Sequence, residues 1–567
     1  MLLNNGKKRV PIGYEDFKQI IDGAFYYVDK TMLIYEILHG GGQNNLITRP
    51  RRFGKTLNFS MLRYFFDITE KDNAYLFDGL KISEHFDEIK MYRNTHPVIT
   101  ISLKCAKQNN YQMAINKIRL EIQEQFKKYR YVWESDAIDK KDRHNAEKIM
   151  LDDSKDDVLS DSIKILSSCL KQYYGVNTII LIDEYDVPLE SAYFNGYYEE
   201  MVSFIRSLFG SALKTNPALE FSVITGCLRI SKESIFTGLN NLRTNTILSA
   251  KYSSQFGFTE DEVKDMLLYY GLEGKIETIK RWYDGYLFGN TEIYNPWSIM
   301  NYVDDLIANP NDFPKANWIN TSSNSIIRSL VERSDEETKA IIERLIYDGT
   351  VETSINETVT YGDLTSVDEC IWSFLLFTGY LRIDKVLYTG EDTGSEAIYS
   401  LKIPNLEIKS CYKKIIIQYF DTYKRAVNKD DLYKALLSGD GEGFAEPITK
   451  LLKSSISFYD NTESFYHGLV SGLLSGNFDY SMKSNRETGN GRSDLILYQQ
   501  DRFINAIIIE FKICKADEEV DEGAKRALRQ INDMDYVADA RAQGYKNILK
   551  YGVAFKNKVC YAVCEKE

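Results

Sequence analysis

The chain has 567 residues, of which 44% are hydrophobic and 27% are charged, a composition that excludes long disorder and indicates roughly two to four folded domains. The net charge of −12 excludes a general attraction to nucleic acid, so any such binding would need a local basic patch. The chain has no run of 18 apolar residues, no signal-peptide core near its start, and eight scattered cysteines without a CxxC pair, which together predict a cytoplasmic protein with no membrane partner.

The N-terminal part of the chain alternates apolar runs with helical stretches. Four runs read as buried strands, at residues 44–48, 97–103, 178–183 and 221–225. Between the second and third run, residues 106–172 read as mostly helical. Strands separated by helices predict a parallel sheet with helices on both faces, which we assign to a first α/β domain of residues 1–255.

The pattern changes after this first domain. A capping box of Thr259 with Glu262, followed by a closing Gly271, predicts a helix. The aromatic segment WYDGYLFGN at 282–290 reads as a turn rather than a regular element. The remaining residues read as mostly helical, so we expect a helical middle domain of residues 256–435.

The last part of the chain returns to strands and helices. A helix is expected at about 462–475, and a second, amphipathic helix carries apolar positions from Val520 to Ile531. The first two of four expected strands form a hairpin and the last two form a pair, at residues 493–498, 504–513, 551–555 and 559–564. These elements predict a C-terminal α/β domain of residues 436–567.

The segment RPRRFGKT at 49–56 matches the end of the phosphate-binding pattern G-x-x-x-x-G-K-[ST]: Gly54, Lys55 and Thr56 fit, but Arg49 stands in place of the first glycine. The segment follows an expected strand and opens an expected helix, the context in which backbone N–H groups meet phosphates. Lys55 would reach the β- and γ-phosphates, and Thr56 would hold Mg²⁺. Taken alone, the tripeptide also fits a chance occurrence.

A second motif, IILIDEYD at 179–186, is an apolar strand that ends in two carboxylates. Asp183 would hold Mg²⁺, and Glu184 would orient and deprotonate the attacking water. The alternative is a strand that ends in a solvated acidic turn. Because both motifs occur in the order of a nucleotide site, we expect Lys55 and the acidic pair to meet across adjacent strand ends, with ATP and Mg²⁺ as cofactors.

The strand at 221–225 ends in Thr225, and Arg229 follows four residues later. Thr225 would sense the γ-phosphate, and Arg229 would neutralise the charge that develops on it. A strand end followed by a surface arginine explains the same residues equally well.

Together with YYVDKT at 26–31, LIDEYDVPL, WYDGY and YNPWS, the RPRRFGKT segment resembles the AAA-ATPase-like proteins that carry a C-terminal PD-(D/E)XK nuclease-like domain. The resemblance runs from about residue 10 to the C-terminus. It implies a P-loop NTPase fold in which RPRRFGK[ST] is the family's form of the Walker A loop, so that Arg49 is a regular feature. It also implies the phosphate, magnesium and Walker B roles given above for Lys55, Thr56, Asp183 and Glu184.

The altered loop has a physical consequence. Pro50 removes one N–H group from the loop, while the arginines add positive charge near the expected position of the triphosphate. We hypothesise that Arg51 and Arg52 replace part of the missing backbone contacts with guanidinium contacts to phosphate. The alternative is that they bind a neighbouring carboxylate or a partner.

A second constellation lies near the C-terminus, where Asp494 begins one expected strand and Glu510-x-Lys512 ends the next. Glu510 and Lys512 share a face of their strand, and a hairpin would bring Asp494 beside them. Two carboxylates and a lysine suit Mg²⁺ or Mn²⁺ and the hydrolysis of a phosphodiester. The alternative is an ion-paired hairpin without catalysis.

The same resemblance covers this region. It implies a restriction-endonuclease-like fold with Asp494, Glu510 and Lys512 as the core triad. It further implies Glu463 as a carboxylate on the preceding helix and Gln530 in support on the following helix. His467 lies four residues after Glu463, on the same helix face, and would also orient water or a metal.

Nucleic-acid binding has mixed support. Residues 481–530 contain nine basic and nine acidic side chains, so no strong basic stripe is present. Three basic residues would contact a backbone locally: Lys483, Arg486 and Arg492. Four aromatic residues would either stack on bases or, as we favour, pack the middle domain against the first: Trp282, Tyr283, Tyr286 and Trp297.

These observations predict an ATP-binding and ATP-hydrolysing protein whose nucleotide state gates a metal-dependent nuclease-like domain. The expected partners are ATP and DNA or RNA, and the sequence is compatible with an oligomer. The alternative is a nucleotide-dependent interaction switch whose C-terminal domain binds nucleic acid or protein without cleaving it. The acidic composition favours the switch, whereas the Asp494 and Glu-x-Lys set opposes it. A third possibility is a fold that binds ATP without hydrolysing it. The presence of Glu184, the expected base, argues against that possibility.

Overall fold

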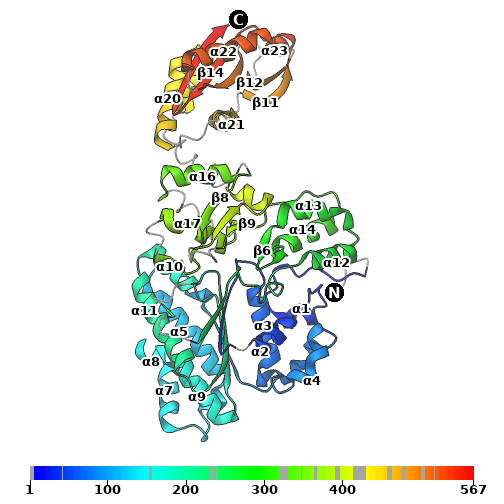
Figure 1. The fold of residues 1–567 in the computed structure, drawn as a ribbon, viewed down its shortest axis with the longest axis vertical. Coiled ribbons are helices and arrows are strands. Elements are labelled where there is room, and N and C mark those ends of the chain that lie inside the picture. The colour runs from blue at the N-terminus through cyan, green and yellow to red at the C-terminus, as the bar shows by residue number, and fades with distance from the viewer. Residues whose placement is uncertain are drawn as a thin grey trace. The chain divides into compact units, whose positions relative to one another are not determined.

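The computed structural model describes most of the chain. The described residues are 6–40, 42–151, 156–229, 235–236, 241–318, 330, 333–346, 348–362, 367–389, 396–412, 429–455, 463–474, 480–488, 491–499, 505–515 and 518–567. The chain divides into two compact units, Met1–Leu330 with Asp348–Cys411 and Val331–Tyr347 with Tyr412–Glu567 (Figure 1). Within the described ranges, no helix combines the length and the apolar character needed to span a bilayer.

A five-stranded parallel sheet forms the core of the first unit, in the order β2-β3-β4-β1-β5. Its strands are β1 Asn44–Thr48, β2 Val98–Ser102, β3 Thr178–Asp183, β4 Leu219–Gly226 and β5 Leu242–Asn245. Every residue of β3 is buried, as its apolar sequence requires. The four strands expected from the sequence are confirmed. The edge strand β5 was missed, because its sequence LRTN is short and polar.

The strand order corrects one expectation about the site. β4 lies between β1 and β3, so the loop after β1 and the acidic end of β3 are not on adjacent strands. They face each other across the end of β4, where Thr225 is located. The expected meeting across adjacent strand ends is therefore wrong in that detail, since neither motif encodes which strand is inserted between them.

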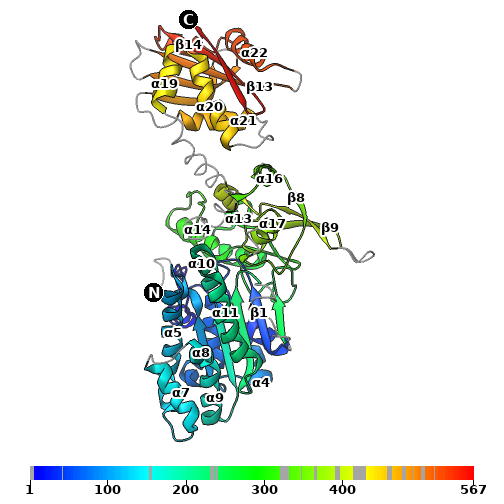
Figure 2. The same cartoon turned by 90° about the vertical axis from the view of Figure 1, so that its left-hand side faces the viewer.

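Helices cover both faces of this sheet (Figure 2). On the right of the sheet in Figure 1 lie α1 Phe17–Asp22, α2 Met32–His39, α3 Lys55–Phe66 and α4 Phe86–Ile89. The group on the left comprises α5 Tyr111–Lys128, α6 Arg130–Trp133, α7 Lys140–Met150, α8 Asp156–Ser160, α9 Ser162–Tyr174, α10 Val187–Asn195 and α11 Tyr198–Phe209. Shorter 3-10 and π turns span Ile68–Phe77, Lys81–His85, Leu103–Ala106, Gly210–Lys214 and Glu273–Lys275.

The rest of the first unit combines helices with small antiparallel sheets. Its helices are α12 Glu260–Tyr270, α13 Ile276–Tyr283, α14 Pro296–Ala308 and α17 Val367–Phe377. The strands β6 Tyr286–Phe288 and β7 Thr291–Ile293 form a hairpin. A second sheet has the order β8-β10-β9, with β8 Val351–Ser354, β9 Arg382–Tyr388 and β10 Ile398–Lys402.

Two local expectations in this region have different outcomes. The capping box is present: the Glu262 N–H donates to Thr259 Oγ1 (3.4 Å), and the Thr259 N–H donates to Glu262 Oε2 (2.8 Å). The segment 282–290, expected as a turn, instead contains β6. Tyr286 and Phe288 are both buried at alternate positions, which is the pattern of a half-buried strand.

The second unit is built on a mixed sheet in the order β11-β12-β13-β14-β15, in which β13 and β14 are parallel and the other pairs are antiparallel. The strands are β11 Tyr480–Thr488, β12 Gly491–Gln499, β13 Ala506–Ile513, β14 Ile548–Lys556 and β15 Val559–Lys566. The helices are α16 Glu336–Ile346, α19 Lys429–Ser438, α20 Gly441–Ser455, α21 Glu463–Leu473, α22 Val520–Asp533 and α23 Ala538–Ala542.

Alternation along β12 and β13 divides their side chains between two cores. Odd-numbered residues such as Leu497 and Ile509 pack with α19, α20 and α21. Even-numbered residues such as Ile496 and Ile508 pack with α22 and α23. By the same period of two, the side of the sheet that faces α22 carries Asp494, Glu510 and Lys512.

Candidate functional site

The loop between β1 and α3 has a shape suited to binding an anion. Arg52 has a φ of 68° and Gly54 a φ of 81°, so the chain passes twice through the left-handed region before α3 begins at Lys55. Such a loop turns backbone N–H groups toward one side, as in an anion-binding nest. The unpaired N–H groups in the first turn of α3 add to this surface.

Arg49 anchors the start of the loop. Its side chain is 0% exposed, and its guanidinium donates to the backbone carbonyl oxygens of Thr48 (2.8 Å), Asn245 (3.1 Å), Lys251 (3.3 Å) and Tyr252 (3.3 Å). The rings of Phe256 and Phe288 lie 5.5 and 5.1 Å from the guanidinium carbon. Burial lowers the pKa of Arg49, and the carbonyl dipoles compensate part of that cost. The arginine at the glycine position therefore fastens the loop to the chain after β5.

The loop's own carbonyl groups hold the Lys55 ammonium. Lys55 is buried, and its Nζ donates to the carbonyl oxygens of Arg49 (2.9 Å) and Pro50 (2.8 Å). An ammonium has three N–H groups, so one remains, with only a long contact of 3.7 Å to Cys227 Sγ. Lys55 lines a cavity, where that N–H would reach a phosphate oxygen.

Asp183, at the end of β3, accepts three hydrogen bonds. The Thr56 hydroxyl donates to Oδ2 (2.8 Å), the Thr225 hydroxyl donates to Oδ1, and the Glu184 N–H donates to Oδ1 (3.0 Å). Burial raises the pKa of Asp183, while the two hydroxyls and Lys55 act in the opposite direction. A carboxylate beside a threonine hydroxyl fits Mg²⁺, which takes few protein ligands and completes its shell with phosphate oxygens and water.

Glu184 follows directly, with a φ of 53° that is uncommon for a residue other than glycine. Unlike Asp183, it is part of the cavity lining. Burial, and then the charge of Asp183, raises the pKa of Glu184. A carboxylate with a raised pKa at this end of the cavity has the properties of a general base toward water.

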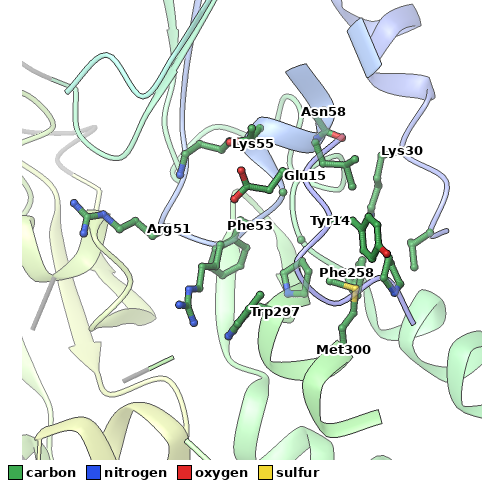
Figure 3. Close-up of a pocket in the computed structure, with 18 of the residues that line it drawn as sticks. Tyr14, Glu15, Lys30, Arg51, Phe53, Lys55, Asn58, Phe258, Trp297 and Met300 are labelled. Carbon is green, nitrogen blue, oxygen red and sulfur yellow. The ribbon is translucent and has the colours of Figure 1, made fainter. Parts of the chain in front are cut away.

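Lys55, Thr56 and Glu184 line one end of a cavity of about 560 Å³, a size typical of small-molecule sites. Figure 3 shows Lys55 and Arg51 at one end and Tyr14, Phe258 and Met300 at the other. A cationic end suits phosphates, and an aromatic and apolar end suits a nucleobase. The cavity therefore has the polarity of a nucleotide site.

Several lining residues escaped sequence reasoning. Glu15 comes from the segment before α1, and Lys104 and Lys107 come from the chain just after β2. The two lysines had a detectable signal, because they follow a buried strand at the carboxyl edge of a parallel sheet. Glu15 had none, since no spacing in the sequence links it to the loop.

Arg51 and Arg52 line the cavity but also have protein partners. Arg51 forms an ion pair with the buried Glu190 of α10. Arg52 donates to the carbonyl oxygen of Asn317 (3.0 Å), and its guanidinium carbon lies 4.3 Å from the centre of the Trp297 ring. The contact of Arg51 with a neighbouring carboxylate is the arrangement named above as the alternative. Phosphate contacts by either arginine stay a prediction.

Thr225 and Arg229 are placed differently from the loop residues. Neither belongs to the described lining of the cavity. Thr225 is fully buried and bonded to Asp183, so the geometry gives it the task of orienting that carboxylate. Arg229 is half-buried beyond the end of β4. Direct contact of either residue with a γ-phosphate stays a prediction.

In the second unit, the antiparallel register of β12 and β13 brings Asp494 beside Glu510. Asp494 Oδ2 accepts a hydrogen bond from the Phe511 N–H (2.8 Å), and Lys512 Nζ donates to Glu510 Oε1 (3.0 Å). The three residues of the D…E-x-K pattern are thus close together at one place on the sheet.

Among the residues of this second site, Glu510 gives the strongest indication that a cation binds there. It is 2% exposed, and its Oε2 accepts no hydrogen bond from the described residues. Burial, and then the charge of Asp494, raises the pKa of Glu510. Because an unpaired buried oxygen is costly, a bound cation would stabilise it. The described part of the chain contains no group of three or more His, Cys, Asp or Glu arranged around a metal, so a site here would have two carboxylates, as suits Mg²⁺ or Mn²⁺.

The supporting residues expected on the two flanking helices have partners of their own. His467 Nε2 lies 2.8 Å from the backbone oxygen of Asp494, so the ring supports β12 at the position of this carboxylate. Gln530 Nε2 donates to the Tyr536 hydroxyl (3.1 Å). Glu463 is the first residue of α21, and its side chain lies outside the described residues.

The basic residues expected near this site are only partly described. The Lys483 ammonium lies 4.8 Å from the centre of the Tyr498 ring. Arg486 and Arg492 belong to β11 and β12, and their side chains lie outside the described part of the structure. Backbone contacts of these residues with nucleic acid stay predictions.

The four aromatic residues divide between two roles. Tyr283 and Tyr286 are buried, and Trp282 packs against the core of α12, α13 and α14. Tyr286 makes the kind of contact that the packing interpretation expects, since its ring lies 5.0 Å from the ring of Phe53 in the loop after β1. Trp297 instead lines the cavity, and its Nε1 donates to the carbonyl oxygen of Asn317 (3.3 Å).

Comparison with known proteins finds a family match in each of the two regions that contain these sites. Residues 11–236 match the family of predicted AAA-ATPases, and residues 461–565 match the PD-(D/E)XK nuclease superfamily. The chain is also 25% identical, over 554 residues and 95% of each chain, to the "Uncharacterized protein in vnfD 5'region" of Azotobacter chroococcum mcd 1. The chain therefore carries an N-terminal AAA-ATPase-like domain and a C-terminal domain of the PD-(D/E)XK nuclease superfamily.

Proposed function

We propose that this protein binds ATP with Mg²⁺ in the cavity of the first unit and hydrolyses it, in the cytoplasm. The hydrogen bond from Thr56 to Asp183 carries the proposal, because it joins the first turn of α3, directly after the loop, to the acidic end of β3. Lys55 and Glu184 line the same cavity. A phosphate-binding cation, two magnesium ligands and a base are what nucleotide hydrolysis requires.

Each side chain would have its own task. Lys55 would donate its remaining N–H to a phosphate oxygen, beside the N–H groups of the loop and of α3. Thr56 and Asp183 would hold Mg²⁺, which when bound supplies positive charge against the phosphate oxygens. Glu184 would accept a proton from the attacking water, and Thr225 would keep Asp183 oriented.

In the second unit we propose a metal-dependent phosphodiesterase site. Asp494 and Glu510 would hold Mg²⁺ or Mn²⁺, whose chemistry is to polarise a phosphodiester and its attacking water. The unpaired, buried Oε2 of Glu510 supports this assignment. Lys512 would contact a phosphate oxygen, which requires it to share its ammonium between Glu510 and the substrate. DNA or RNA is the proposed substrate.

We further propose that the nucleotide state of the first unit gates cleavage by the second. The alternative function is a nucleotide-dependent interaction switch whose C-terminal domain binds without cleaving. The net charge of −12 favours this alternative, because it opposes binding to a phosphate backbone.

Purified protein, incubated with labelled DNA or RNA and Mg²⁺ or Mn²⁺, with and without ATP, would test the proposal. Glu184→Gln should retain ATP binding while phosphate release falls by about a hundredfold or more. Asp494→Ala should abolish cleavage and leave phosphate release unchanged. The matched controls substitute exposed residues and should behave as wild type: Glu199→Gln for the first site and Asp533→Ala for the second.

Three outcomes are distinguishable. ATP-dependent cleavage lost in Asp494→Ala supports the gated nuclease. Phosphate release without cleavage under every condition supports the interaction switch. Absence of both ATP binding and phosphate release in the wild-type protein contradicts the proposed nucleotide site.

A further inference from the structure

We propose that Lys104 contacts the terminal phosphate of the bound nucleotide, and that it exchanges an ion pair with Glu15 for this contact. The inference rests on the proposed nucleotide site and adds a residue to it that neither sequence motif contains. Lys104 would be the second cation at the phosphate end of the cavity. It follows β2, the strand that pairs with β3 on the side opposite β4.

The fold fixes the position of Lys104. Ser102, the last residue of β2, pairs with Asp183, and Lys104 follows two residues later in the turn Leu103–Ala106. Leu103 and Ala106 are fully buried and anchor this turn. Lys104 itself stays accessible and lines the cavity together with Lys55 and Glu184.

The other cations of this end are already engaged. Two of the three N–H groups of Lys55 go to loop carbonyls, and Arg51 is paired with Glu190. Arg52 lies against Trp297. The charge that develops on a terminal phosphate requires stabilisation in the transition state. A further cation at this end would add to that stabilisation.

The electrostatic surroundings of Lys104 agree with this role. Burial alone would lower its pKa, but the carboxylates of Glu15, Glu184 and Asp183 outweigh burial and raise it. The ammonium therefore stays charged at neutral pH, close to the proposed base and magnesium ligand. Lys107, in the same segment, lies instead 3.9 Å from Glu190.

Glu15 holds Lys104 only weakly. Their ion pair spans 3.3 Å, with side-chain exposures of 58% for Lys104 and 63% for Glu15, and exposed pairs of this kind contribute little to stability. A terminal phosphate carries more charge and accepts stronger hydrogen bonds, so the exchange favours the nucleotide.

The backbone around Glu15 keeps its carboxylate near the phosphate end. The next residue, Asp16, caps α1 by accepting from the Gln19 N–H (3.0 Å) and also accepts from the Ser60 hydroxyl of α3 (3.1 Å). Figure 3 shows Glu15 on the side of Lys55, away from Phe258 and Met300. Glu15 is thus a protein carboxylate placed where a phosphate would compete with it.

The test compares ADP with the non-hydrolysable β,γ-imido analogue of ATP, each with Mg²⁺, by competition against a fluorescent ADP. Lys104→Ala should weaken binding of the ATP analogue about tenfold or more and leave ADP binding within about twofold, because ADP lacks the terminal phosphate. Lys104→Arg should restore most of the affinity. The matched control is Lys127→Ala, which removes a lysine from an ion pair of similar exposure outside the cavity lining and should leave the binding of both nucleotides unchanged.

Glu15→Gln should have the opposite effect and tighten binding of the ATP analogue by about two- to fivefold, since the competing carboxylate is removed. In the Lys104→Ala background the same substitution should have no effect. A tightening that persists without Lys104 would show general charge repulsion and overturn the exchange.

Equal loss of both nucleotides in Lys104→Ala, or no loss, would overturn the phosphate contact while leaving the nucleotide site intact. A wild-type protein that binds neither nucleotide would overturn the site and this inference together.

Discussion

Replacing Arg49 by glycine would restore the general phosphate-binding pattern, and we expect it to destabilise the first unit. The variant loses the donors to four carbonyl groups, of which those of Thr48 (2.8 Å) and Asn245 (3.1 Å) make the shorter bonds and that of Lys251 is only partly buried. An acceptor left without its donor costs about 1–2 kcal/mol, and the emptied side-chain volume adds a cavity cost. The variant also no longer pays the desolvation cost of a buried guanidinium that lacks a carboxylate partner, which offsets part of this cost. The free energy of unfolding should therefore fall by about 3 kcal/mol.

Tryptophan fluorescence in urea measures this loss for the first unit alone. All five tryptophans lie there, at positions 133, 282, 297, 318 and 372. Arg49→Lys keeps the charge but replaces the branched guanidinium with a single ammonium group. The stability of this variant should therefore lie between those of Arg49→Gly and wild type. An Arg49→Gly variant that unfolds at the wild-type urea concentration and binds Mg-ATP normally would refute the anchoring role.

Three further predictions concern single buried groups. Thr225→Val removes a hydroxyl that orients Asp183, and calorimetry should show magnesium-dependent ATP binding weakened about tenfold, or ~1.4 kcal/mol. Glu407 has a pKa that burial raises to about 7 from an ordinary 4.5, so the folded state retains a proton that the unfolded chain releases, and stability falls as the pH rises from about 4.5 to 7. Unfolding in urea at pH 5 and pH 8 should show a loss of up to about 3 kcal/mol in wild type, and Glu407→Gln should remove that pH dependence. Glu510→Gln should abolish Mn²⁺ binding measured by calorimetry, whereas the exposed Glu522→Gln should bind as wild type; equal binding by both would contradict the metal site.

The predictable parts of the fold are those in which local pattern and burial coincide. Residues 179–182 are apolar, and the strand 178–183 that contains them is fully buried. In the capping box, both hydrogen-bonding residues, Thr259 and Glu262, lie within a four-residue segment that can be recognised in the sequence. β5 could not be found this way, because an edge strand of polar sequence has no such pattern. The segment 282–290 was misread because glycines and aromatics also occur in tight hairpins.

The same distinction holds at the candidate site. Lys55, Thr56 and the Asp183–Glu184 pair were predictable because each lies in a contiguous motif next to a strand. The inserted position of β4 was not, since strand order is set by long-range packing. Three of the four carbonyl partners of Arg49 lie about two hundred residues away, and Glu15 lies 89 residues from Lys104, so no local pattern could reveal these contacts.

The central claim is that Lys55 and the acidic end of β3 form one magnesium–nucleotide site. Isothermal titration calorimetry of the wild-type protein with the β,γ-imido analogue of ATP tests it most directly, beside Lys55→Ala and the surface control Lys171→Ala. We expect saturable binding that requires Mg²⁺, persists in Lys171→Ala and falls at least about tenfold in Lys55→Ala. A wild-type protein that gives no binding heat at any usable concentration, or a Lys55→Ala variant that binds as tightly as wild type, would contradict the claim.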